Sequence, residues 1–238
     1  MGTQTETADV GARNIGESSA PEELVAWSLE KFAERTLAIT TAFGMEGCAL
    51  IDMYARHRRR MRVIYLDTMF FFPETYALRD RLAARYPWLE LVNRGTAMTP
   101  AEQAALYGDE LWKRDPNLCC KIRKVEPMRA ALTGVDVWIT GLQRSQSATR
   151  AGIRVLEWDW KYQILKFSPL AATDRKWVWE YVRKNGVPYN ELHERGYPTI
   201  GCIHCTKPVD GAKLGEYTRE GRWAGLDKTE CGLHGDGI

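Results

Sequence analysis

Four cysteines form two close pairs that could hold a metal group. Cys119 and Cys120 are adjacent, and Cys202 and Cys205 form a CxxC pair. Four thiolates arranged in this way can bind a zinc ion or a 4Fe-4S cluster. Structural zinc sites usually separate the members of a ligand pair by a few residues, so that both sulfurs face one small ion. A cluster offers each sulfur its own iron, so the adjacent pair favours a 4Fe-4S cluster over zinc.

The CxxC pair has a second interpretation, as a dithiol redox pair with His204 inside it. It lies between Gly201 and Pro208 in a loop-rich region, and not at the strand-to-helix junction that a thioredoxin-like active site requires. We therefore prefer metal ligands. Cys48 lies in an apolar helix segment, and we interpret it as a buried structural thiol.

Cys231 remains after the four ligands are assigned. A lone thiol beside Gly232 could be presented to two partners in turn, as a covalent shuttle requires. An ordinary cysteine, with a pKa of about 8.5, is only a few per cent thiolate at neutral pH. A nucleophilic role therefore needs nearby cations, and Arg219, Arg222 and His234 are available. From the residues alone, an incidental cysteine in a weakly structured segment is an equal alternative.

The elements that must position these residues alternate between strands and helices. Strands are predicted at residues 37–42, 63–66, 89–93 and 135–140, and helices at 48–57, 73–86, 119–132 and 173–185, after a first helix that begins at Pro21. This alternation predicts the α/β class, with a mainly parallel sheet flanked by helices. Such sheets bind ligands beyond the carboxyl ends of their strands, so we expect residues 43–47, 67–68 and 141–147 to converge on one crevice.

Composition excludes several classes of protein. The 33 basic residues against 31 acidic ones leave a formal net charge of +2, without a long basic block, so we expect no nucleic-acid partner. The least polar long stretch, residues 37–54, contains Glu46 and Asp52, so no membrane span is predicted. The first residues lack the pattern of a secretory signal, which predicts a cytoplasmic protein whose cysteines are ligands or catalysts and not disulfides.

Five segments carry a resemblance to a known family. Together they strongly resemble the assimilatory adenylylsulfate (APS) reductases. The segments are LDTMFFFPETY (66–76), CCKIRKVEPM (119–128), WITGLQRSQSATR (138–150), VPYNELHERGYPTIGCIHC (187–205) and ECGLH (230–234). Members that carry both cysteine pairs resemble the iron-sulfur branch of the APS/PAPS reductase family, which generally uses adenosine 5'-phosphosulfate. The branch without these pairs generally uses the 3'-phosphorylated form.

The resemblance implies a fold and a reaction. The fold would be that of the adenine nucleotide alpha-hydrolases, related to the ATP pyrophosphatases and usually assembled as homo-oligomers. Cys119, Cys120, Cys202 and Cys205 would hold a 4Fe-4S cluster, and Cys231 would attack the sulfur of the sulfate group and expel AMP. Thioredoxin, as a separate protein, would then release sulfite. The implied organisation is a mobile leader (1–20), a nucleotide-binding α/β reductase domain (21–205) and a C-terminal arm with the nucleophile (206–238).

The resemblance also implies the residues that bind substrate. The planar guanidinium of arginine suits sulfate and phosphate, and the sulfate end would contact Lys124, Arg144, Arg150, Arg219, Arg222 and His234. The adenosine end would be held by Thr41, Phe43, Gly44, Glu46, Leu66, Asp67, Thr68 and the loop that starts at Gly141. Gln143, Ala224 and Thr229 depart from the family's pattern, and Gln143 and Thr229 each stand where a cation is usual.

Three other functions stay open. A 3'-phosphoadenylylsulfate (PAPS) reductase, or an enzyme that uses both substrates, would keep the whole arrangement. A tRNA thiolase built on a related sheet would need an SGGxDS-type loop after the first strand and a basic RNA-binding face, and neither TTAFGMEG (40–47) nor a net charge of +2 provides them. A zinc or iron-sulfur sensor or structural module would leave Cys231 without a role.

Overall fold

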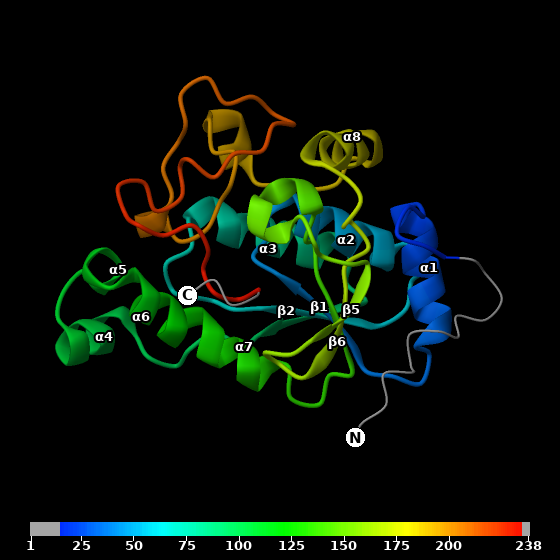
Figure 1. Cartoon of the computed structure of the whole chain (residues 1–238), viewed down its shortest axis with the longest axis horizontal. Helices are drawn as coiled ribbons and strands as arrows, with labels where there is room; N and C mark the ends of the chain where they lie inside the picture. The colour runs from blue at the N-terminus through cyan, green and yellow to red at the C-terminus, as the bar shows by residue number, and fades with distance from the viewer. Residues whose placement is uncertain (1–14, 235–238) are drawn as a thin grey trace.

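A six-stranded β-sheet forms the centre of the protein, whose residues 15–234 are described by a computed structural model (Figure 1). The strand order is β3-β2-β1-β4-β6-β5. The strands are β1 (Leu37–Thr41), β2 (Met61–Tyr65), β3 (Leu89–Asn93), β4 (Val137–Ile139), β5 (Leu156–Asp159) and β6 (Ile164–Phe167). Every neighbouring pair is parallel except β5 with β6. The predicted α/β class with a mainly parallel sheet is confirmed.

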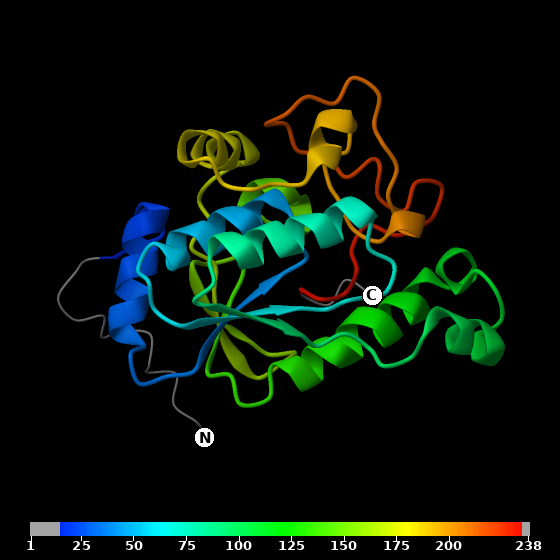
Figure 2. The ribbon, with the colours of Figure 1, turned by 180° about the vertical axis from the view of Figure 1, so that it is seen from behind.

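Helices cover both faces of this sheet (Figures 1 and 2). One face carries α1 (Pro21–Lys31), α2 (Met45–Ala55), α3 (Pro73–Arg85) and α8 (Arg175–Asn185), and the other carries α7 (Glu126–Ala131). Successive side chains of a strand point to opposite faces. Ile39 and Val63 therefore pack into the core around α2, whereas Ala38 and Ile64 pack against α7. Burial on both faces explains why apolar residues predominate in the central strands.

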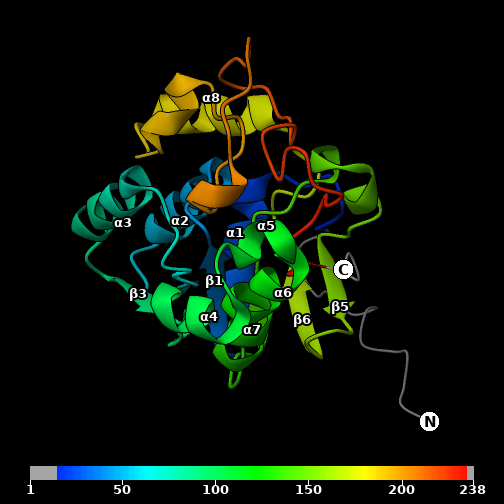
Figure 3. The ribbon, with the colours of Figure 1, turned by 90° about the vertical axis from the view of Figure 1, so that its left-hand side faces the viewer.

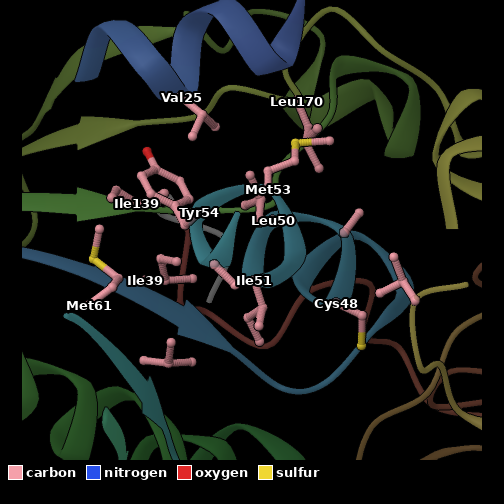
Figure 4. Packing of buried hydrophobic residues seen from close by; sticks show 14 of the residues in the cluster. Val25, Ile39, Cys48, Leu50, Ile51, Met53, Tyr54, Met61, Ile139 and Leu170 are labelled. Carbon is pink, nitrogen blue, oxygen red and sulfur yellow. The ribbon is translucent and has the colours of Figure 1, made fainter. Parts of the chain in front are cut away.

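The larger core surrounds α2, whose side chains pack against α1 and the sheet (Figure 4). Leu50, Ile51 and Cys48 are fully buried within it. The Cys48 thiol donates a long hydrogen bond to the carbonyl of Phe43, and burial raises its pKa to about 12. The interpretation of Cys48 as a structural thiol agrees with this environment.

Several boundaries and elements differ from the sequence prediction. Helix α2 begins at Met45 and not at residue 48, because Gly44 follows the strand almost directly and caps the helix. The predicted helix at 119–132 consists of α6 (Pro116–Cys120), a π-helical turn η1 (Lys121–Val125) and α7. Helix α4 (Pro100–Tyr107), the short α5 (Leu111–Arg114) and the β5–β6 hairpin were not predicted. Within residues 15–234, no helix is long and apolar enough to span a bilayer.

The segment 206–234, which we call the arm, lies at the same end of the molecule as α4, α5 and α6 (Figure 3). Its regular structure within the described residues is a single β-bridge between Thr206 and Arg222. Backbone hydrogen bonds from Lys207 to Gly221 and from Trp223 to Cys205 fix its path, and the Trp223 side chain is buried. The arm therefore has little regular structure, in agreement with the weakly structured segment that the sequence predicts, and its path is fixed by these contacts. Residues 1–14 of the predicted leader and 235–238 lie outside the described residues.

Candidate active site

The carboxyl ends of β2, β1 and β4, which are neighbours in the sheet, bring the predicted adenosine-binding residues together. Thr41, Gly44, Asp67 and Gly141 are half-buried at this edge. The side chains of Phe43, Glu46, Leu66 and Thr68 are buried below it. Only the first group is accessible enough to contact a ligand directly.

The turn between β1 and α2 is tightly built. The Phe43 N–H donates to Thr41 Oγ1 at 2.8 Å, and Phe43 has a φ of 58°, which is strained for an aromatic residue. A Cβ on Gly141 would lie 3.1 Å from the Cβ of Glu46, so glycine lets the loop after β4 approach α2 closely. The free N–H groups at the start of α2 then lie beside both loops, where they favour a phosphate group.

Three of the predicted adenosine-binding residues have internal partners. Glu46 forms an ion pair with Arg175 at 3.1 Å and accepts a hydrogen bond from the Gln146 amide at 3.2 Å. Asp67 accepts from the Met69 N–H and the Tyr76 hydroxyl, both at 2.8 Å. The Thr68 hydroxyl accepts from Cys202 Sγ at 3.4 Å. Glu46 and Thr68 therefore support this edge of the sheet from below, and Thr68 also contacts the second cysteine pair through Cys202.

Cys119, Cys120, Cys202 and Cys205 line one pocket, although the two pairs are far apart in the sequence. The first pair ends α6, and the second occupies the short helix η5 (Ile203–Cys205) and the residue before it. The Ile203 N–H donates to the Phe70 carbonyl at 2.8 Å, which ties this loop to the segment after β2. His204 stacks on Trp112 with ring centroids 3.9 Å apart and forms the outer wall.

The four cysteines of this pocket are close enough to influence one another's ionisation. Burial, together with the charges of the neighbouring Cys120, Cys202 and Cys205, raises the pKa of Cys119 to about 12, so the thiols of the two pairs influence one another. Yet among residues 15–234 no three cysteine, histidine or acidic side chains are grouped closely enough for one metal ion. The donor set of four thiols lining one pocket fits the ligands of a 4Fe-4S cluster.

Cys231 lies half-buried beside this pocket, in a cationic environment. Burial by itself would raise the pKa of its thiol, but Lys124, the Leu233 N–H and Arg222 together lower it below the usual value, against the opposing charge of Glu230. Lys124 also lines the cysteine pocket, so one ammonium group faces both kinds of sulfur. A stabilised thiolate is the reactive form of cysteine.

The predicted sulfate-binding arginines divide into two groups. Arg150 and Arg219 both donate to one oxygen of Glu230, at 2.9 and 3.2 Å, and Arg222 lies over the Trp223 ring at 4.4 Å from its centroid. These three are gathered around Cys231. Arg144 is not: it binds the carboxylate of Glu17 and lines a different pocket, between the start of α1 and the start of α8.

The β5–β6 hairpin supplies residues that sequence reasoning missed. Lys161 donates to the Gly232 carbonyl, next to Cys231, and the charge of Cys231 contributes to raising the pKa of Tyr162, for which burial is the largest cause. His234 stacks on Trp138 with ring centroids 5.0 Å apart. The alternation of apolar and polar residues in LEWDWKYQILKF (156–167) was the available signal for this hairpin.

Unpartnered polar atoms gather under the arm. The Tyr162 hydroxyl, Arg219 Nε, Trp223 Nε1, Glu230 Oε1 and His234 Nδ1 are all buried without a hydrogen-bond partner among residues 15–234. Burial and surrounding cations, Arg150 foremost, lower the pKa of His234 well below its usual range, so its ring is neutral. Each unsatisfied buried group costs about 1–3 kcal/mol. Arg219 Nε, Trp223 Nε1 and the Tyr162 hydroxyl can donate to a bound anion, whereas Glu230 Oε1 is an acceptor and would oppose one.

Comparisons with known proteins identify relatives over most of the chain. Residues 36–208 match the family described as "Phosphoadenosine phosphosulfate reductase domain". The chain is 45% identical over 212 residues to the adenosine 5'-phosphosulfate reductase of Lysinibacillus sphaericus, covering 89% of each protein. It is also 45% identical over 237 residues to the phosphoadenosine 5'-phosphosulfate reductase of Gloeobacter violaceus, covering 98% of this chain and 96% of the relative.

A solved structure agrees with these relatives. The phosphoadenylyl-sulfate (PAPS) reductase of Candida auris, solved as a phosphate complex, matches with a TM-score of 0.69 and 33% identity, over 81% of this chain and 91% of that one. The predicted adenine nucleotide alpha-hydrolase-like fold is confirmed by this likeness and by the strand order. The family match alone spans well over half of the sequence. The chain therefore belongs to the phosphoadenosine phosphosulfate reductase domain family.

Proposed function

We propose that this protein reduces adenosine 5'-phosphosulfate (APS) to sulfite and AMP, with Cys231 as the nucleophile. The observation that carries the proposal is the position of Cys231 between the cations Lys124 and Arg222, beside the pocket of four cysteines. The relatives named above act in the same chemistry, on APS or on its 3'-phosphorylated form.

The first step is a transfer of the sulfo group. The Cys231 thiolate attacks the sulfur of the substrate's sulfate, a sulfur–sulfur bond forms, and the bond between that sulfur and the phosphate oxygen breaks. AMP leaves with the electron pair, and an S-sulfocysteine remains on the protein. Lys124, Arg219 and Arg222 are close enough to the thiol to stabilise the charge that moves from sulfur to the leaving phosphate.

The second step needs a dithiol reductant, for which we propose thioredoxin. One thiolate of the reductant attacks Cys231 Sγ, and sulfite leaves with the electron pair. The second thiol of the reductant then resolves the mixed disulfide, which returns Cys231 as a thiol and leaves thioredoxin oxidised by two electrons. We further propose that the enzyme works in the cytoplasm as a homo-oligomer.

The adenosine half of the substrate would lie at the edge formed by β2, β1 and β4. Thr41, Gly44, Asp67 and the loop that starts at Gly141 are accessible there, and the N–H groups at the start of α2 suit the 5'-phosphate. Arg150 and His234 lie toward the arm, so the sulfo group would point at Cys231 when the nucleotide occupies the crevice.

Cys119, Cys120, Cys202 and Cys205 would hold a 4Fe-4S cluster. When bound, the cluster would supply a fixed charge beside Lys124, because four protein thiolates leave no iron open to substrate. The chain's own contribution is the surrounding shell. Thr68 Oγ1 lies 3.4 Å from Cys202 Sγ, so its hydroxyl could donate to that sulfur once it is a thiolate ligand, and Arg123 is buried alongside with bonds to Gln103 and the Thr68 carbonyl. These contacts fix the two cysteine segments against one another.

PAPS is the second candidate substrate, and the name of the Gloeobacter relative favours it. The two substrates differ by a 3'-phosphate, so turnover on APS and PAPS, measured side by side, decides between them. The cluster itself is tested by iron and sulfide analysis of anaerobically purified protein, which should be brown.

A labelling experiment tests the nucleophile. Anaerobic protein incubated with APS labelled in its sulfate, without reductant, should take up one label per chain, and thioredoxin should release it as sulfite. The variant Cys231→Ser should take up none, whereas Cys48→Ala, which removes the thiol of the helical core, should label normally. Uptake of label by Cys231→Ser would contradict the assignment of Cys231 as the nucleophile.

A further inference from the structure

The carboxylate of Glu230, directly before the nucleophile, occupies two of the arginines that the proposed reaction needs. Its Oε2 accepts from Arg150 at 2.9 Å and from Arg219 at 3.2 Å. The Glu230 side chain is 8% exposed, that of Arg150 is 12% exposed and that of Arg219 is 20% exposed, so water screens these contacts weakly. In this state the arginines face a protein carboxylate where the proposed substrate would present its own anionic oxygens.

The contact between Glu230 and the two arginines leaves hydrogen-bonding groups on both sides without partners. Both arginines share a single oxygen, while Glu230 Oε1 is buried without a partner among residues 15–234. Arg219 Nε is buried and unpartnered in the same part of the chain. A guanidinium that serves only a carboxylate normally uses two parallel hydrogen bonds to its two oxygens. Two positive charges against one negative charge, with donors left over, fit an anion that carries more oxygens than Glu230.

The arginines are held in place by other partners. Arg150 also donates to Gln146 Oε1, and Gln146 in turn donates to Glu46 at 3.2 Å. Arg219 donates to the Thr229 carbonyl at 2.7 Å and lies over the Trp223 ring, 5.6 Å from its centroid. Arg150 therefore keeps a partner outside the arm and Arg219 keeps partners within it when the Glu230 side chain is replaced.

We propose that Glu230 is an internal stand-in for the substrate's anionic group, which occupies Arg150 and Arg219 in the empty site and leaves them when APS binds. The inference rests on the proposed function and adds that Glu230 and the substrate compete for the same two arginines. Every molecule of APS must displace the carboxylate, so the charge of Glu230 weakens substrate binding. The same carboxylate ties the arm to the loop after β4 through its contact with Arg150, whereas its contact with Arg219 lies within the arm itself.

The test measures binding without chemistry. The holoprotein carrying Cys231→Ser serves as the parent, because it lacks the nucleophile, and APS binding is measured by calorimetry with and without Glu230→Gln. Glutamine keeps the shape of the side chain and removes its charge, so we expect APS to bind at least about fivefold tighter, since truncating one side of a buried charged contact has effects of this order or larger. Glu220→Gln, an exposed position of the same arm, is the matched control and should leave the affinity unchanged.

A second readout follows the arm. Trypsin should cut the arm of the Glu230→Gln protein faster than that of the parent when no ligand is present, and APS should protect both proteins. Should Glu230→Gln fail to fold, Glu230→Asp withdraws the carboxylate from the arginines and should tighten APS binding in the same direction. APS affinity equal to the parent's, or weaker, overturns the inference alone, whereas a parent that binds no APS overturns the proposed function itself.

Discussion

At the scale of single residues, the charge around Cys231 decides its reactivity. Burial disfavours a thiolate, and Glu230 does too, yet the pKa of Cys231 is lowered because Lys124, Arg222 and the Leu233 N–H act in the opposite direction. Lys124 is the largest of these favourable influences. Neither Lys124 nor Arg222 has a carboxylate partner among residues 15–234, so their charge is available to the thiolate and to an incoming anion.

Replacing Lys124 with methionine should therefore raise the pKa of Cys231. The thiol ionises less at neutral pH, and each unit of pKa lowers the rate of alkylation by roughly tenfold in the range where the thiol is protonated. The measurement is the pH profile of iodoacetamide reaction at Cys231, read by mass spectrometry. Lys121→Met is the matched control, because Lys121 belongs to the same π-helical turn but its side chain is exposed. An unshifted profile in Lys124→Met would contradict the assignment.

At the scale of elements, the loops that follow β2 and β3 are locked together at a glycine. Asn93 Oδ1 accepts from the N–H groups of Asp67 at 3.3 Å and Gly95 at 2.9 Å. A Cβ on Gly95 would lie 2.1 Å from the Asp67 carbonyl oxygen, where a backbone atom blocks it. Asp67 is part of the edge proposed to bind adenosine, so the position of that edge depends on a residue in the neighbouring loop.

The substitution Gly95→Ala should accordingly damage both stability and nucleotide binding. Overpacking of this kind costs about 1–3 kcal/mol, and the Asp67 loop must move to relieve it. We expect a lower midpoint in urea and weaker AMP binding by calorimetry. Gly152→Ala is the control, since a Cβ there meets nothing within 4 Å. A Gly95→Ala protein with unchanged AMP affinity would show that this loop does not hold the nucleotide.

The sequence predicted the elements with strong periodicity and missed those fixed by distant contacts. Strand β3 matches the predicted range, since its apolar run is bounded by clear turn residues. Helix α2 begins earlier than predicted because Gly44, not a polar residue, caps it. The four cysteines were predicted to meet, and they line one pocket, whereas Arg144 sits apart because Glu17 binds it. A motif conveys residue types, but Glu17 and Arg144 are distant in sequence, and their pairing follows from the three-dimensional fold.

At the scale of the whole molecule, a buried polar network joins α8 to the crevice and to the segment before the arm. Arg175 of α8 binds Glu46 of α2 at 3.1 Å. His193, in the short helix η4 (Glu191–Arg195), is buried near this pair and bonds through Nδ1 to the Tyr197 carbonyl at 2.7 Å. Its Nε2 is buried without a partner among the described residues. A protonated ring would therefore bring a second cation beside Arg175.

Stability should consequently fall in acid through His193. Burial, and then the charge of Arg175, lower its pKa from 6.5 to about 4, although the Tyr197 carbonyl and Glu46 oppose the shift. The unfolded chain therefore takes up a proton below pH 6.5 that the folded protein refuses until about pH 4, so the free energy of unfolding decreases over that window. At pH 5 the loss amounts to about 2 kcal/mol relative to neutral pH.

Replacing His193 with asparagine should remove this dependence, because its amide can still donate to the Tyr197 carbonyl but does not titrate. Urea unfolding at pH 7.5 and pH 5 measures it. At pH 7.5 the variant should be less stable than the natural protein, since a smaller side chain leaves a cavity. At pH 5 that deficit should shrink by about 2 kcal/mol.

The control is His57→Asn, at an exposed position. It should leave the difference in the free energy of unfolding between pH 7.5 and pH 5 as it is in the natural protein. An equal loss in His193→Asn and in the natural protein would mean that the acid sensitivity of the fold lies in its carboxylates and not in this ring.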